Sequence, residues 1–374
     1  MMGRITYLMK LELFWIIFCL TLFLHLFSYN LPAYFDFIPF AFSLTYFVLK
    51  NRRFTINNNL VIYLGLLVIY GMVLFIGGAI NLDFDIRLRT ASYLFFYFIP
   101  ISLVFYNVIN NSNFETIHQS LFLSYLILAA AVYFLYANGY IAWNRYQQVG
   151  NILAALSILS LGYRFKTKAT KIIVVTIILF CLLDVGSRQA IAGLVFCMLF
   201  FAFFTNYKFL LSFLIIAGLV YLNLDAITEW FIESDFSKNY NATRRIAYAL
   251  KNNGGESIQI RMEIYENLIQ QIKTYPNLSF SPNNILSYPH NFFLEFSISC
   301  GLIIGAFLLT TIGYVLYSVA SLTPNRSLFY FSLLFFIPFN VSTGFSAAKY
   351  FLYYFVLILV LSKQPKTAFN QRII

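Results

Sequence analysis

Charged side chains are scarce in this chain of 374 residues: 10% are Asp, Glu, Lys or Arg, whereas 60% are hydrophobic. Soluble globular domains carry about 25% charged residues, so this composition excludes that class of protein. The apolar runs are continuous and do not alternate with polar residues. We therefore predict helices that cross a membrane, because a helix satisfies its own backbone hydrogen bonds in lipid.

Cysteine and histidine are also rare, with four and three residues respectively. All four cysteines fall inside apolar runs, and the sequence contains no Cys-x-x-Cys motif or Cys/His cluster. This pattern argues against a periplasmic disulfide and against a metal site built from such ligands. Asp83 and Asp85 could bind a divalent cation, but two arginines follow closely, and a solvated charge cluster is the simpler interpretation. We expect no metal and no cofactor.

The lengths of the apolar runs predict an all-α integral membrane protein with about twelve transmembrane helices, since a bilayer core needs about 20 apolar residues per helix. We expect residues 1–374 to form a single polytopic domain. The first run leads directly into others and lacks a cleavable signal pattern, so we interpret it as an anchor. The predicted spans are 11–29, 31–49, 59–79, 90–108, 118–138, 149–163, 171–184, 187–205, 207–222, 291–319, 327–341 and 346–362.

The net charge of +11 follows the predicted topology. Fourteen Lys and Arg residues fall on the short segments of one side of the bilayer, and the other side holds five, namely Arg87, Arg89, Arg145, Arg188 and Lys349. The positive-inside rule therefore predicts that both termini are cytoplasmic. This basicity needs no nucleic acid as a partner.

One long loop, residues 223–290, lies on the outer side in this topology. Apolar residues recur at helical spacing from Ser257, and Pro276 ends the pattern, so we predict an amphipathic helix within the loop. Its predicted apolar face consists of Ile260, Ile264, Leu268 and Ile272, with Tyr265 and Ile269 beside them.

Two arginines on the outer side stand in contexts that could bind an anion. Arg188 follows Ser187, which can cap a helix, and a helix start with an arginine suits phosphate; a snorkelling membrane anchor is the alternative. Arg261 lies at i, i+4 and i+7 with Tyr265 and Leu268, on the apolar face of its helix. Its guanidinium either faces an anion, or it lies in water while the aliphatic part of the Arg261 side chain packs against apolar neighbours.

Three further arginines are weaker candidates. Arg244 and Arg245 lie in a polar stretch, and Arg145 precedes another outer helix start. A solvated basic surface explains these three residues equally well.

A Pro-His-Asn tripeptide closes the long loop. An imidazole group ordinarily titrates near neutral pH, so the side chain of His290 could accept a proton from a sugar hydroxyl; an interfacial histidine that faces solvent is the alternative. Asn291 and Glu295 could support it, although Glu295 does not share the face of His290 on the helix.

Three segments together resemble the O-antigen polymerase and O-antigen ligase superfamily of bacterial inner membranes. They are VGSRQAIAGLVF (185–196), IQIRMEIYENLIQQIKTYP (258–276) and PHNFFLEFSISCGLIIGAFLL (289–309), and they match the family's Ser-Arg helix start, Arg-x-x-x-Tyr helix and His-Asn segment. VGNILAAL (149–156) is similar to an outer helix start of the family that contains Asn. Where the family often has glycines after the proline, this chain reads PNLSFSPNN.

This resemblance implies a GT-C-like glycosyltransferase that uses undecaprenyl-diphosphate-linked glycans at the periplasmic face without a metal. Arg188 and Arg261 would clamp the diphosphate, with Arg244, Arg245 and Arg145 as weaker contacts, and Tyr265 could support them. His290 would position or deprotonate the acceptor hydroxyl. A chain-length regulator is an expected protein partner.

Within the resemblance, polymerase and ligase differ in the acceptor, which is a lipid-linked repeat unit or lipid A-core. The Phe-, Tyr- and Asn-rich composition favours the polymerase. A flippase for lipid-linked sugar would need charged residues along a path through the membrane. We find few inside the predicted spans, chiefly His25 and Asp36. A scaffold without catalytic activity would leave the arginines and His290 without a common role.

Overall fold

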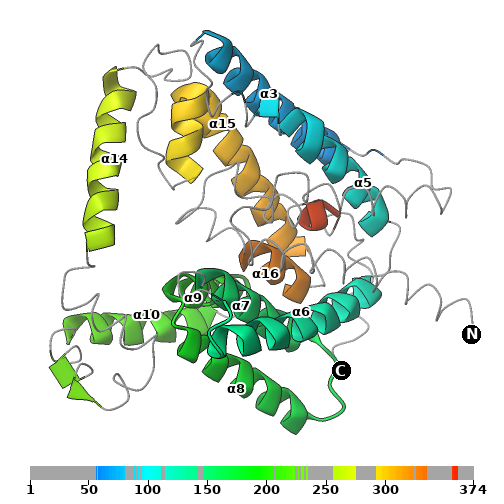
Figure 1. Ribbon diagram of the computed structural model, residues 1–374, viewed down its shortest axis with the longest axis vertical. Helices are drawn as coiled ribbons and strands as arrows, with labels where there is room; N and C mark the ends of the chain where they lie inside the picture. The colour runs from blue at the N-terminus through cyan, green and yellow to red at the C-terminus, as the bar shows by residue number, and fades with distance from the viewer. Residues whose placement is uncertain are drawn as a thin grey trace, which may run out of the picture. The chain divides into compact units, whose positions relative to one another are not determined.

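The computed structural model is mostly helical in the part of the chain that it describes, which confirms the all-α class. The described part comprises residues 58–80, 94–110, 114–141, 146–205, 207–223, 256–274, 292–322, 326–334 and 356–360, with a few single positions besides. No strand occurs in these ranges (Figure 1). The first two predicted spans lie outside the described residues.

The chain divides into two compact units. Unit 1 is formed by Met1–Pro32 and Phe114–Gln259, and unit 2 by Ala33–Asn113 and Ile260–Ile374. Unit 1 contains α6 (Phe114–Ala137), α7 (Tyr146–Gly162), α8 (Lys168–Val185), α9 (Arg188–Thr205) and α10 (Tyr207–Leu222). Unit 2 contains α3 (Asn58–Ile80), the π-helix η2 (Leu94–Phe98), α5 (Ile99–Asn110), α15 (Phe292–Leu322) and α16 (Arg326–Leu334). Helix α14 (Glu256–Thr274) begins in unit 1 and lies mostly in unit 2.

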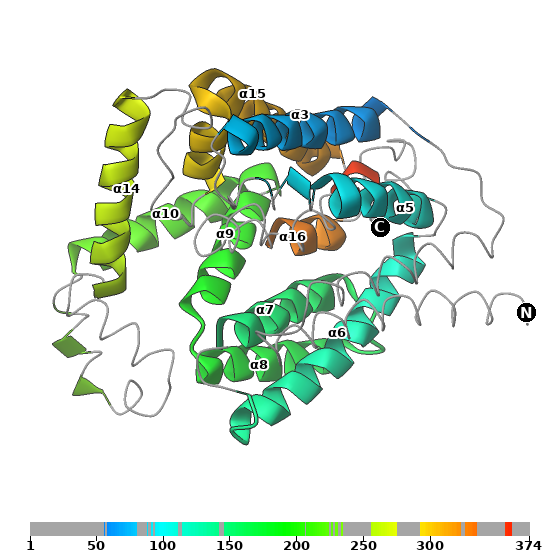
Figure 2. The same cartoon turned by 45° about the horizontal axis from the view of Figure 1, so that its top comes forward.

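Helix α7 is the central helix of unit 1 and packs against α6, α8 and α9 (Figure 2). Its residues are buried from Val149 to Ser160 with the exception of Asn151. Several of them are small, including Gly150 and Ala154, and small residues let neighbouring helices approach closely. A helix that is apolar on all faces lies in a protein core or in a membrane, and neighbouring helices bury most of α7.

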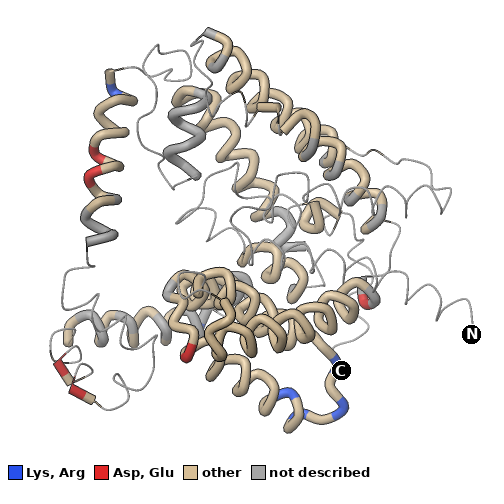
Figure 3. The backbone as a smooth tube through the Cα atoms, in the orientation of Figure 1, with Lys and Arg blue, Asp and Glu red and all other residues tan. Residues whose placement is uncertain are grey.

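One end of unit 1 is held by aromatic packing. The rings of Phe122 and Tyr163 stack with centroids 3.9 Å apart, and Phe165 meets both edge-on. Arg164 forms an ion pair with Glu115 at 2.8 Å, but both side chains are largely exposed, so the pair adds only about 0–1 kcal/mol. Basic residues gather in the connection between α7 and α8, whereas few charges interrupt the helices around it (Figure 3).

Unit 2 contains a helix pair that depends on a glycine. Helix α3 packs against η2, α5 and α15. At Gly71 an added Cβ would lie 2.9 Å from Cζ of Phe95, so the missing side chain admits the aromatic ring.

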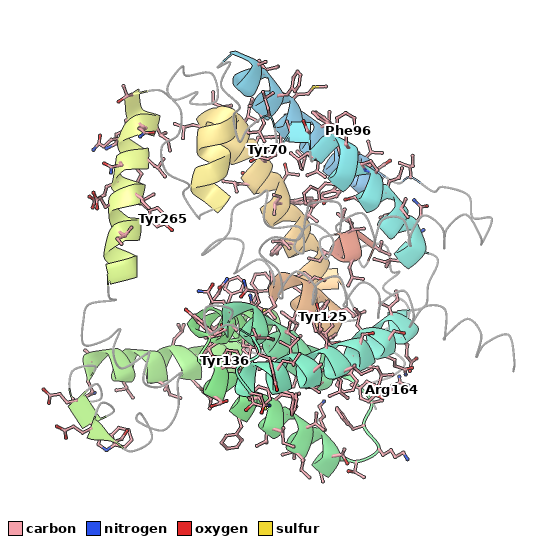
Figure 4. The ribbon with its side chains drawn as sticks, viewed as in Figure 1. Tyr70, Phe96, Tyr125, Tyr136, Arg164 and Tyr265 are labelled. Atoms are coloured by element: carbon pink, nitrogen blue, oxygen red, sulfur yellow. The ribbon has the colours of Figure 1, made fainter. Side chains whose placement is uncertain are left out.

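The predicted span at 90–108 is not one regular α-helix, because the π-helix η2 precedes α5. Tyr70 is buried and Phe96 is exposed (Figure 4).

Helix α15 is broken at Gly301. The spacing of Gly301 and Gly305 predicts close helix packing, but Gly301 has φ 74° and ψ 164°, which is not a helical conformation. This backbone region is open almost only to glycine. The continuous span predicted from residue 291 is thus two helical pieces.

We expect Gly301→Ala to destabilise the protein by about 1–3 kcal/mol, because alanine strains this conformation. Gly313→Ala in the same helix is the matched control, since an added Cβ there meets nothing within 4 Å. Thermal melts of both purified variants in detergent would measure the difference. Equal melting temperatures would show that the break is not needed.

Two helices in the described part are long and apolar enough to cross a membrane, at Leu60–Gly77 and Ile117–Ala137. Shorter apolar helices occupy Gln189–Phe200 and Gly301–Tyr317. These lengths are consistent with membrane association. The number of twelve spans and their orientation remain predictions.

The bounds of several helices agree closely with the sequence patterns. Helix α10 was expected at 207–222 and occupies Tyr207–Leu222, and α14 occupies Glu256–Thr274 within the expected amphipathic stretch. The buried face of α14 is narrower than expected. Leu268 and Ile272 are buried, but Ile260 and Ile269 are 49% and 42% exposed.

Candidate functional site

The helix ends opposite the aromatic cluster bring several polar residues of unit 1 together. Consecutive helices α6, α7, α8 and α9 reverse direction at short connections, so the end of α6 and the start of α7 lie with the end of α8 and the start of α9. Figure 4 shows Tyr136 toward the left end of the helices α6 to α9 and Arg164 toward their right end. We call this set the polar end of unit 1: Tyr133, Gln147, Gln148, Asn151, Asp184 and Ser187.

A tight turn joins α8 to α9 at this end. Gly186 adopts the left-handed conformation, φ 71°, and its N–H donates to the Leu182 carbonyl at 3.2 Å. Ser187 then caps α9, since its Oγ accepts from the Ala190 N–H at 3.3 Å. The predicted cap by Ser187 is confirmed. Arg188 is the first residue of α9.

The starts of α7 and α9 meet at Gly150. An added Cβ at Gly150 would lie 2.2 Å from Cβ of Ser187 and 3.2 Å from Cβ of Ala190. Only a glycine permits this approach, which brings the start of α9 against the fifth residue of α7. The free N–H groups of a helix start favour anions, and here the starts of two helices lie within about one turn of the same contact.

A hydrogen bond between α6 and α8 lies at the same end. The Tyr133 hydroxyl donates to Asp184 Oδ2 at 3.0 Å, in a partly buried position. Asp184 lies two residues before Gly186, so this bond ties the turn between α8 and α9 to α6. A bond to a charged acceptor contributes about 1.5–3 kcal/mol.

The structure places only part of the predicted site. Arg188 begins α9, Arg261 belongs to α14 and Glu295 to α15, but their side chains lie outside the described residues. Tyr265 on α14 is partly buried. Arg145, Arg244, Arg245, His290 and Asn291 fall outside the described residues, as do Asp83 and Asp85.

The structure thus brings together two of the predicted segments. The start of α9 at Arg188 contacts the start of α7, and Arg145 immediately precedes α7 in the sequence. The contact lies within unit 1. The segments that carry Arg261 and His290 belong to unit 2, and their proximity to this contact is a prediction.

Two features of the polar end of unit 1 are not among the sequence-based predictions. Asp184 at the edge of a predicted span is a visible signal, because an acidic residue in an apolar helix usually has a purpose and a partner. Its partner Tyr133 is 51 residues away, which no local pattern reveals. Gly150 is one of 17 glycines, and only the packing distinguishes it.

Comparisons with known proteins found no match: no family model matches the sequence, and no curated protein or solved structure matches it significantly.

Proposed function

We propose that this chain is a polymerase of bacterial surface polysaccharide, which joins undecaprenyl-diphosphate-linked repeat units at the periplasmic face of the inner membrane. The architecture in this proposal is GT-C-like, with about twelve transmembrane helices and the loop 223–290 on the outer side. The order of the Ser-Arg, Arg-x-x-x-Tyr and His-Asn segments supports it.

The observation that carries the proposal is the meeting of two helix starts at Gly150 and Ser187. The donor of this reaction is a lipid diphosphate, and its leaving group gains negative charge in the transition state. Backbone N–H groups at adjoining helix starts stabilise such charge, and Arg188 stands at the first position of one of them. No metal is needed where arginines and helix starts supply the positive potential.

In the proposed reaction the acceptor hydroxyl oxygen bonds to the anomeric carbon of the donor sugar. The bond from that carbon to the diphosphate oxygen breaks, and undecaprenyl diphosphate leaves with the electron pair. His290 positions the hydroxyl or takes its proton. Arg188 and Arg261 hold the diphosphate, and attack from the opposite face inverts the anomeric centre.

Deletion of the gene in its native host tests this function. For a polymerase we expect surface glycan to collapse from a ladder to a single repeat unit, and plasmid-borne wild type to restore the ladder. The readout is the glycan pattern on a gel, with lipid-linked intermediates extracted from the same cells.

Three other patterns would contradict the polymerase. Long glycan that accumulates on undecaprenyl diphosphate without reaching its final acceptor would identify a ligase. Single lipid-linked units retained on the cytoplasmic side would identify a flippase. A deletion strain with an unchanged ladder would refute all three activities.

A further inference from the structure

Two carboxamide side chains in the first turns of α7 lack hydrogen-bond partners. The oxygens Gln148 Oε1 and Asn151 Oδ1 are shielded from solvent, and neither has a partner within the part of the chain that the structure describes. Both side chains are otherwise partly exposed. They are three residues apart on a helix and therefore share a face.

Such groups are uncommon because they cost stability. A buried polar group left without a partner costs about 1–3 kcal/mol, and most proteins pair nearly all of them. Two exposed side-chain amides of unit 1, in contrast, have partners. Asn138 Nδ2 donates to the Phe134 carbonyl at 2.7 Å, and Asn223 Nδ2 donates to the Leu219 carbonyl at 2.8 Å.

The chemistry of a carboxamide selects the class of ligand. Each amide offers an oxygen that accepts and an NH₂ group that donates. A sugar hydroxyl also donates and accepts, so it can satisfy both functions. A diphosphate at neutral pH has acceptors only and leaves the amide oxygens unmet. The pair therefore suits the sugar part of a lipid-linked glycan and not its diphosphate.

The position of the two carboxamides is compatible with binding of the sugar at one place and of the diphosphate at another. Gln148 and Asn151 flank Gly150, where α7 contacts the start of α9, so the carboxamides lie within about one helical turn of that contact along α7, on a neighbouring face of the helix. A sugar attached to that diphosphate would be near them. Because both side chains are partly exposed, rotation of their terminal torsions presents the amides without moving a helix.

We propose that Gln148 and Asn151 form a subsite for sugar hydroxyls of the lipid-linked glycan, an assignment that rests on the proposed polymerase function. The subsite forms hydrogen bonds with the sugar hydroxyls, whereas the adjoining helix starts and arginines bind the diphosphate. In the free protein a water molecule can occupy the same hydrogen-bonding position, and a sugar hydroxyl replaces it.

Apolar side chains of similar shape test the subsite. Gln148→Met and Asn151→Leu remove the amides with little change in volume, so stability should be unchanged or raised, because an unmet polar group is lost. Binding of the free repeat-unit oligosaccharide, released by mild acid from the host's lipid carrier, should weaken about fivefold for each variant. Calorimetry on the full chain in nanodiscs measures affinity, and thermal melts measure stability.

Asn138→Leu is the matched control, since its amide is exposed and already bonded to Phe134. We expect it to leave oligosaccharide binding unchanged. Undecaprenyl diphosphate alone is the second probe, and its affinity should be the same in wild type and in both subsite variants.

The outcomes separate the two proposals. Wild type that binds the oligosaccharide, with variants that bind equally well, would overturn the subsite alone. Wild type that binds neither probe would overturn the proposed function together with the subsite. Variants that lose affinity for both probes would show a general disruption of the site and would also contradict a role confined to the sugar.

Discussion

His290→Ala is expected to reduce the glycan ladder to a single repeat unit while the protein remains in the membrane at wild-type abundance. Residue 290 lies outside the described residues, and the expectation rests on its place in the Pro-His-Asn tripeptide at the end of the outer loop. Loss of a general base lowers a rate by about 10²–10⁴-fold, which leaves too few transfers to build a polymer. The readout is the gel of the complemented deletion strain, with the protein quantified by immunoblot.

A second substitution at the same position separates the two roles assigned to the imidazole. His290→Gln keeps hydrogen bonding but cannot take a proton at neutral pH. If His290 acts as a base, the glutamine variant should be as inactive as the alanine variant; partial rescue would indicate positioning. Arg261→Ala should also lose the ladder, with Arg164→Ala as its control, because Arg164 is an exposed arginine in the connection between α7 and α8, away from the polar end of unit 1. A full ladder from His290→Ala would refute its role.

Gly150→Ala is expected to destabilise unit 1 at the contact between α7 and α9. The new methyl group would lie 2.2 Å from Cβ of Ser187 and 2.6 Å from its Oγ, so α7 and α9 must separate. Overpacking of this kind costs about 1–3 kcal/mol, and often more when backbone has to move. Since the same contact holds the two helix starts together, glycan synthesis should fall as well. Thermal melts and the complementation gel measure the two effects.

Gly218→Ala is the matched control for this substitution. Gly218 lies inside α10, where an added Cβ meets nothing within 4 Å. Alanine is favoured over glycine in a helix interior by up to about 1 kcal/mol, so this variant should be as stable as wild type or more stable. Similar melting temperatures for both variants would mean that the contact at Gly150 is not tight in the folded protein.

The helices were largely predictable because their signal is local. Continuous apolar runs separated by polar segments define α3, α6 and α10 within a few residues, and the amphipathic stretch that contains Tyr265 is the helix α14. The break in α15 was not predictable in this way. A glycine in an apolar run is compatible both with helix packing and with a positive φ, and only the backbone of Gly301 distinguishes them.

The candidate site was predictable only in its local parts. Ser187 before Arg188 indicates a capped helix start, and the cap is present. The partner helix was not predictable, because the contact from Gly150 to Ser187 joins residues 37 positions apart (187 − 150 = 37). The same reason hid the bond from Tyr133 to Asp184 and the unmet amides of Gln148 and Asn151.

The sequence by itself determined the helical class, the positions of most of the described helices and the apolar composition that favours association with a membrane. These properties follow from composition, from the period of the α-helix and from the side chains themselves, all of which are local. Only the tertiary structure decided which helix starts adjoin, which acid is bonded to which tyrosine and which amides lack a partner. These features depend on distances between segments that are remote in the chain, and such distances are set by close packing of the whole unit.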